Sequence, residues 1–329
     1  MKNFNTLYVV PRCYTGSDRY YELLASHVPN TDICWLPKYY TFFPPLLFIW
    51  RFFSKKFQKS KIIHTNCEFG IYLFSFKRKL VVTFHHNIFA KLNFKNLQFY
   101  KKIFYIFFAP LLFNISMRLA KKIILIQMED YKIYSNIAPL KNKCVHIWNG
   151  IDDTELLDIR PDFFQKKTNK IRILFVGKKS IRKWWDLVQD ILLLPGADEL
   201  DLYCVSMDGY KQKKAFFTDL GTLERVDLLR LMKSVDIVFL PSRIEGFSYT
   251  IAEALSLWTC TLARNDWGWF WESYGNLFQV FGTSDSPKEL LLLLCNLSEI
   301  AKNPKAVFIP RNMNILHTSK SYFQLYSEI

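Results

Sequence analysis

The sequence predicts two consecutive α/β domains, each built on a parallel sheet that is covered by helices on both faces. The chain has 329 residues, which fits two domains of roughly 150 residues better than one core. Half of the residues are apolar, so a sizeable core can form. Short apolar runs recur along the chain with helical patterns between them, which is typical of strands in a buried parallel sheet.

The apolar runs form two series that are separated by a stretch without a clear period. The first series comprises the runs 7–10, 61–64, 80–84, 122–126 and 145–148, with a helix expected over 19–28. The second series comprises the runs 171–177, 201–205 and 235–240. The stretch 153–170 between them is predicted to be a linker. We therefore expect one domain at 1–155, a second at 165–310, and a C-terminal helix within 311–329 that packs near the first domain.

Charge divides between the two predicted domains. The net charge is +15, and residues 1–150 hold 22 Lys or Arg against 6 Asp or Glu, whereas residues 151–329 hold 22 against 23. A basic half suits an anionic partner, although a lysine-rich solvated surface would give the same count. No nucleic-acid-binding motif occurs, and the lysines alternate with apolar runs, so nucleic acid is not expected as a partner.

Aromatic residues and lysines occur together in the stretch 39–57, which ends in a basic run. Rings at the headgroup boundary and cations on lipid phosphates suit peripheral contact with an anionic membrane, although a helix packed on the sheet would also explain the pattern. The longest apolar stretch, 103–117, is shorter than the ~20 residues that a spanning helix needs. Seven cysteines without Cys-x-x-Cys spacing and an N-terminus without a signal-peptide core predict a cytoplasmic protein, associated with the inner face of the cytoplasmic membrane.

The segment after the predicted strand end at Leu240 carries two glutamates around a glycine. Backbone N–H groups after Gly246 would lie at a helix N-terminus, which suits phosphate or sugar oxygens. Eight helical residues leave an offset of about 80°. Glu245 and Glu253 can therefore converge on one ligand only if the first lies in the loop and the second in the helix. On spacing alone, a capping box between Thr250 and Glu253 is equally good.

This segment, 240–255, resembles the Glu-x7-Glu signature of glycosyltransferase family 4, a family of retaining enzymes with the GT-B fold. Further segments resemble the family in the same order along nearly the whole chain, namely 81–85, 126–129, the Asn-Gly-Ile-Asp sequence at 149–152, 175–183 and 220–229. The resemblance implies GT-B architecture, with two Rossmann-like doubly wound domains facing a cleft. It also implies a hexosyltransferase that uses a nucleoside-diphosphate sugar, with a UDP-sugar favoured over a GDP-sugar.

The resemblance also assigns candidate site residues. His85 and Glu245 are the catalytic candidates, and Glu253 would bind the ribose of the donor nucleotide. The other donor-binding candidates, which would contact sugar or phosphate oxygens, are Gly16, Lys178, Lys183, Gly246, Phe247 and Ser248. Lysines and helix-end amides stabilise a leaving diphosphate without a metal, so neither a metal nor another cofactor is expected.

Each of these assignments has a structural alternative. The two lysines would otherwise be surface charges, His85 a histidine at a strand end, and Gly16 part of an ordinary turn. Trp184 and Trp258 stand where the family has glycine, and Lys178 stands where arginine is usual. These departures motivate an alternative function, a catalytically decayed carbohydrate- or membrane-surface-binding protein of the same fold. For an active enzyme, the basic first half favours a surface-glycan or glycolipid acceptor such as lipopolysaccharide.

Overall fold

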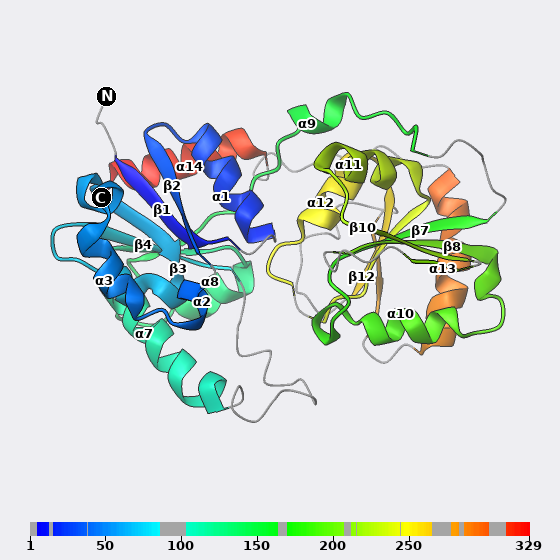
Figure 1. The fold of residues 1–329 in the computed structure, drawn as a ribbon, viewed down its shortest axis with the longest axis horizontal. Coiled ribbons are helices and arrows are strands. Elements are labelled where there is room, and N and C mark those ends of the chain that lie inside the picture. The colour runs from blue at the N-terminus through cyan, green and yellow to red at the C-terminus, as the bar shows by residue number, and fades with distance from the viewer. Residues whose placement is uncertain are drawn as a thin grey trace. The chain divides into compact units, whose positions relative to one another are not determined.

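The protein consists of two compact α/β units, which is the fold class that the sequence predicts (Figure 1). The computed structural model describes residues 5–12, 16–37, 39–85, 103–163, 170–206, 212–214, 216–243, 245–264, 278–282, 286–302 and 314–329. Unit 1 comprises Met1–Asp152 with Arg311–Ile329, and unit 2 comprises Asp153–Pro310.

Unit 1 contains a six-stranded parallel sheet with the order β2-β1-β3-β4-β5-β6. Its strands are β1 (Thr6–Pro11), β2 (Thr31–Leu36), β3 (Ile62–Asn66), β4 (Lys79–Phe84), β5 (Lys122–Leu125) and β6 (Cys144–His146). The central strands β1, β3 and β4 are almost wholly buried, in agreement with their apolar runs. Strand β2 is not predicted from the sequence, because this edge strand is half-exposed and begins with the polar residues Thr31 and Asp32.

Helices cover both faces of this sheet (Figure 1). The helical segments are α1 (Gly16–His27), α2 (Tyr39–Phe42), α3 (Leu46–Phe53), α4 (Lys55–Lys59), η1 (Cys67–Phe69), α5 (Gly70–Leu73), the π-helical turn η3 (Phe104–Phe108), α7 (Ala109–Leu119), α8 (Met128–Tyr134) and α14 (Ile315–Ser327). Helix α5 packs against α3 and α7. Within the described ranges, no helix has the length and hydropathy to cross a membrane.

The C-terminal helix α14 packs against α1 within unit 1. The Ile315 amide donates to the Ile151 carbonyl at 2.9 Å, and the Thr318 hydroxyl donates to the Trp148 carbonyl at 3.1 Å. Gly150 allows this approach, because a Cβ at this position would lie 2.6 Å from the Cα of Ile315. The Asn-Gly-Ile-Asp sequence therefore holds the start of α14 by backbone contact.

Unit 2 contains a seven-stranded sheet with the order β13-β12-β11-β7-β8-β10-β9, in which only the β9–β10 pair is antiparallel. The strands are β7 (Ile171–Val176), β8 (Leu200–Val205), β9 (Gln212–Lys214), β10 (Phe217–Gly221), β11 (Ile237–Leu240), β12 (Cys260–Arg264) and β13 (Phe278–Phe281). The helical segments are α9 (Thr154–Leu157), η4 (Ile181–Lys183), α10 (Trp185–Leu192), η5 (Ala197–Glu199), α11 (Arg225–Ser234), α12 (Tyr249–Ser256) and α13 (Pro287–Lys302). Helix α10 packs with α13, and α11 packs with α12.

The stretch 153–170 is not wholly irregular, because it begins with the short helix α9. Leu156 of α9 is buried, whereas Leu157 is largely exposed. A single helical turn is too short to produce a period that sequence analysis can detect.

Candidate functional site

Most of the candidate donor-binding residues lie where the carboxyl ends of the parallel strands of unit 2 meet, which we call the unit 2 edge. Because β7 and β11 are adjacent and parallel, the loops that follow them leave the same edge, which is where doubly wound sheets bind ligands. Lys178 and Lys183 follow β7, while Glu245 and Gly246 follow β11 and Glu253 lies in α12. The structure therefore places these segments together. His85 and Gly16 belong to unit 1, at the end of β4 and at the first residue of α1.

Glu245 lies in the loop before α12 and forms an ion pair with Lys183. The two side chains are 9% and 12% exposed, so the pair is largely removed from water. Burial by itself raises the pKa of Glu245, but the adjacent Lys183 and Arg182 outweigh it and hold the pKa below its ordinary range. Burial lowers the pKa of Lys183, and Glu245 opposes that shift only in part.

Gly177 makes room for this ion pair. Its φ of +148° belongs to the region that glycine favours, and a Cβ there would lie 3.2 to 3.3 Å from the side-chain carbons of Lys183. The lysine stem therefore lies directly against the backbone at the end of β7. Lys178, which follows Gly177, is exposed, whereas Lys179 forms an ion pair with the buried Asp219. Lys179 and Lys183 thus both have carboxylate partners that the sequence did not indicate.

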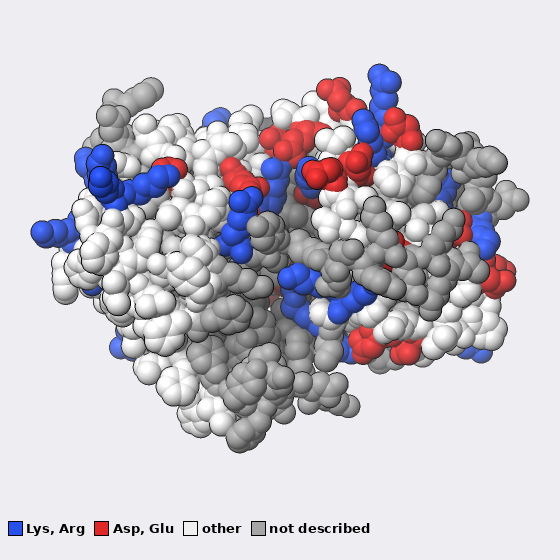
Figure 2. All heavy atoms as spheres, in the orientation of Figure 1, with Lys and Arg blue, Asp and Glu red and all other residues white. Residues whose placement is uncertain are grey.

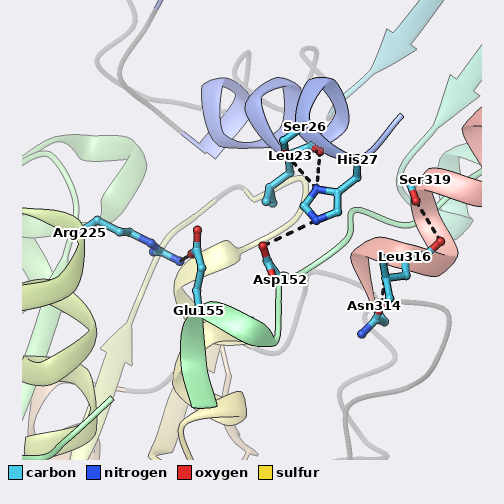
Figure 3. Close-up of polar contacts among 9 residues, drawn as sticks. All are labelled: Leu23, Ser26, His27, Asp152, Glu155, Arg225, Asn314, Leu316 and Ser319. Carbon is cyan, nitrogen blue, oxygen red and sulfur yellow. Dashed lines mark hydrogen bonds and ion pairs between the residues drawn. The ribbon is translucent and has the colours of Figure 1, made fainter. Parts of the chain in front are cut away.

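Glu253 is buried in α12 and is neutralised by Arg225, the first residue of α11. The Nη2 atom of Arg225 lies 2.9 Å from Oε1 of Glu253. The same atom lies 3.3 Å from Oε2 of Glu155 in α9, and Figure 3 shows this second contact. Burial by itself lowers the pKa of Arg225, but the two carboxylates raise it above its ordinary value. Arg225 was not singled out from the sequence, because a single arginine at a helix start forms no recognisable pattern.

The capping alternative for Glu253 is wrong. Ser248 is the N-cap of α12, and its hydroxyl accepts a hydrogen bond from the Ile251 amide at 3.3 Å. Thr250 is already inside the helix, so the Thr-x-x-Glu spacing has no capping function here. The first turn of α12 carries no acidic side chain that would offset the partial positive charge of the helix N-terminus.

The loop before α12 supplies the remaining candidates. Gly246, Phe247 and Ser248 are consecutive residues that lead into the first helical turn, and Ser248 is buried. The ring of Phe247 meets that of Tyr249 edge-on, at 5.1 Å between centroids. Helix α12 begins directly after this loop, and the backbone N–H groups at a helix N-terminus are suited to anionic ligands.

Trp184 and Trp258 both have a backbone conformation that glycine adopts more readily than other residues. Trp184 has φ 53° and Trp258 has φ 65°, both in the left-handed region that L-residues rarely adopt. The ring of Trp184 lies 4.9 Å from the guanidinium carbon of Arg243 and 5.1 Å from that of Arg264. Cation–π contacts of this kind help to offset the backbone strain, which typically amounts to about 1–3 kcal/mol per residue.

His85 is half-buried directly after β4 in unit 1. Its Nε2 atom lies 3.1 Å from Oδ1 of Asn66, and the rings of Tyr20 and Tyr21 meet the imidazole edge-on at 5.0 and 5.8 Å. Burial lowers the pKa of His85 to about 4, so the ring is neutral at physiological pH. The loop residues just before Gly16 lie outside the described residues.

Ionisable side chains do not form a metal site in the described part of the chain, where no group of three His, Cys, Asp or Glu residues could hold an ion. The polar atoms at the unit 2 edge are instead paired carboxylates and cations, together with backbone amides. Such an edge can accept hydrogen bonds from hydroxyl groups and donate hydrogen bonds to an anion.

Comparison with known proteins identifies the fold. No family model and no curated protein matches the sequence. Among solved structures, HepE of Anabaena in complex with UDP is similar, with a TM-score of 0.68, 14% identity, and coverage of 99% of this chain and 100% of that chain. A glycosyltransferase of Rickettsia africae has a TM-score of 0.64, 14% identity, and coverage of 100% and 99%.

Sucrose-phosphate synthase of Thermosynechococcus elongatus is similar over the same extent, with a TM-score of 0.66, 13% identity, and coverage of 98% of each chain. These three structural similarities span both units. Each unit contains a sheet of mainly parallel strands, as the GT-B fold requires. The chain therefore has the GT-B fold, as the sequence predicts.

The pairing of Arg225 with Glu253 can be tested by comparing two arginines of α11. Arg225→Ala should lower the free energy of unfolding by about 1–3 kcal/mol, because it leaves a buried carboxylate without its partner. Arg230→Ala, which removes only exposed contacts, should stay within about 0.5 kcal/mol of the parent protein. Chemical denaturation of both variants measures the difference, and equal losses would contradict the assignment.

Proposed function

We propose that the protein is a retaining glycosyltransferase that moves a hexose from a UDP-sugar to a hydroxyl group of an acceptor. The observation that carries the proposal is the composition of the unit 2 edge, where Glu253, the Lys183–Glu245 pair and the start of α12 follow adjacent parallel strands. The GT-B fold supports it. So does HepE, which has been crystallised in complex with UDP-glucose.

The proposed donor contacts follow from the chemistry of each group. The Glu253 carboxylate, held by Arg225, is an acceptor suited to the two hydroxyl groups of a ribose. The amides of Gly246, Phe247 and Ser248 suit the oxygens of the sugar and the diphosphate. Lys183 and Lys178 supply positive charge to the diphosphate, and Glu245 accepts from the hydroxyl groups of the donor sugar.

The proposed reaction needs charge stabilisation more than a proton donor. The bond between the anomeric carbon and the diphosphate oxygen breaks, and the acceptor oxygen bonds to the same face of that carbon. The acceptor proton passes to an oxygen of the leaving phosphate. Negative charge grows on the diphosphate, where two lysines and the α12 amides stabilise it, so the proposed reaction requires no metal.

The proposed acceptor is a lipid-linked or surface glycan such as lipopolysaccharide, and its support lies in unit 1. Figure 2 shows a largely uncharged surface over α3, with basic side chains at its margin. The exposed apolar residues of α2, α3 and the turn between them are Tyr39, Phe43, Phe48, Ile49, Phe52 and Phe53, and Phe76 is exposed in the loop between α5 and β4. Rings next to cations suit peripheral contact with an anionic membrane, at the inner face of the cytoplasmic membrane.

One observation favours the alternative function, a sugar- or membrane-binding protein that has lost activity. Lys183 and Glu245 already neutralise each other, so a diphosphate must compete with or share the lysine. Thermal unfolding in the presence of UDP distinguishes the two functions, because an intact donor site stabilises the folded state on binding. Absence of stabilisation by any nucleoside diphosphate or sugar nucleotide would favour the alternative.

The donor assignment predicts different kinetic effects for the two glutamates. Glu253→Gln should raise the KM for the donor by about tenfold, equivalent to about 1.4 kcal/mol, because an amide accepts ribose hydrogen bonds more weakly. Glu245→Ala should lower kcat by about 100-fold, because contacts to the reacting sugar are lost. Release of UDP from a panel of UDP-sugars measures both.

Glu289→Ala is the matched control, because Glu289 is exposed at the start of α13 and is remote in sequence from the candidate residues. It should retain the parent KM and kcat. Full activity of a folded Glu245→Ala variant would refute the assignment of that residue.

Membrane contact predicts co-flotation with anionic vesicles. The protein should float with phosphatidylglycerol-containing liposomes at low salt, and Phe52→Ser combined with Phe53→Ser should abolish flotation because two exposed rings are lost. Leu193→Ser, which replaces an exposed apolar residue of unit 2, should float like the parent protein. Failure of the parent protein to float would remove the membrane from the proposal.

A further inference from the structure

Asn66 contacts the imidazole of His85, and Tyr21 in turn holds Asn66; neither residue belongs to the candidate site. Asn66, the last residue of β3, contacts Nε2 of the imidazole at 3.1 Å. The hydroxyl of Tyr21 in α1 donates to the same Oδ1 atom of Asn66 at 2.7 Å. Asn66 and Tyr21 are both buried, so the amide has little freedom to turn toward water.

The hydrogen bonds fix which nitrogen of His85 carries the proton. An amide oxygen can only accept, so the contact between Oδ1 of Asn66 and Nε2 requires a hydrogen on Nε2. The pKa of His85 is about 4 because of burial, so the ring carries a single proton near neutral pH. Nδ1 is therefore an unprotonated nitrogen, and no residue in the described ranges hydrogen-bonds it.

Hydrogen bonds among buried side chains hold Tyr20 of α1 in place next to His85. The Tyr20 hydroxyl contacts Thr83 at 3.2 Å and also the hydroxyl of Tyr322 in α14. His64 lies between Thr83 and Tyr326, at 2.6 Å from each. The rings that meet His85 edge-on are therefore held in place by α14 and the sheet.

We propose that Asn66 is a positioning residue that selects the Nε2–H tautomer of His85 and thereby presents Nδ1 as a hydrogen-bond acceptor. The group that Nδ1 accepts from is a hydroxyl of a bound sugar. This second statement rests on the proposed function, whereas the tautomer does not. Because the ring is neutral, His85 orients the sugar and does not donate a proton to it.

The tautomer can be measured without any substrate. Histidine labelled with ¹⁵N distinguishes protonated from unprotonated ring nitrogens in long-range proton–nitrogen spectra, and a His85→Gln variant identifies the signal among the six histidines. We expect a neutral His85 with the proton on Nε2 from pH 5 to pH 8. A proton on Nδ1 in the parent protein would overturn the proposal.

Asn66→Asp gives a readout that a purely structural role would not produce. A carboxylate at this position stabilises the imidazolium ion and raises the pKa of His85, so the ring gains a proton at Nδ1. Transfer activity should fall at neutral pH and recover as the pH rises through the new pKa. Tyr326→Phe removes a buried hydroxyl of the same network without touching Asn66 or His85, and it should leave the pH profile unchanged.

The outcomes separate the two parts of the proposal. A pH profile of Asn66→Asp that matches the parent protein would refute the positioning function of Asn66. If the spectra show the Nε2–H tautomer but the parent protein transfers no sugar from any donor, the tautomer stands and the proposed function fails.

Discussion

The unit 2 edge depends on the neutralisation of two buried carboxylates. Glu253 and Glu245 both lie where water has little access, and an isolated charge in such a place is strongly unfavourable. Each carboxylate therefore forms an ion pair with a cation, Glu253 with Arg225 and Glu245 with Lys183. These partners come from other segments of the sheet edge, so the ion pairs connect α11 and η4 to the loop and helix that follow β11.

The ion pairs also explain why the surrounding backbone is unusual. Gly177 lets the stem of Lys183 pass close to the end of β7, and Trp184 follows in a left-handed conformation directly after that lysine. Trp184 keeps the backbone shape of a glycine while its ring contacts Arg243 and Arg264. Buried pairs of this kind contribute little net stability, which is consistent with a binding function for the carboxylates.

The sequence predicted the fold because buried parallel strands leave short runs of consecutive large apolar residues, such as 173–176 and 237–240. It did not predict β2 or β12, whose runs contain polar residues and are therefore less distinct. The 80° offset placed Glu245 in the loop and Glu253 in a helix, and both placements are confirmed. The sequence could not predict Arg225 or Asn66, because they reach the candidate residues through tertiary contacts between elements distant in sequence.

A crystal structure of the protein soaked with UDP would show whether Glu253 and the start of α12 bind the donor nucleotide, and a parallel GDP soak would compare the two bases. We expect the ribose hydroxyl groups to bind the Glu253 carboxylate and the diphosphate to bind the amides at the start of α12, with Lys183 turned toward it. A nucleotide bound elsewhere, with the Arg225–Glu253 pair unchanged and the α12 amides unoccupied, would contradict this expectation.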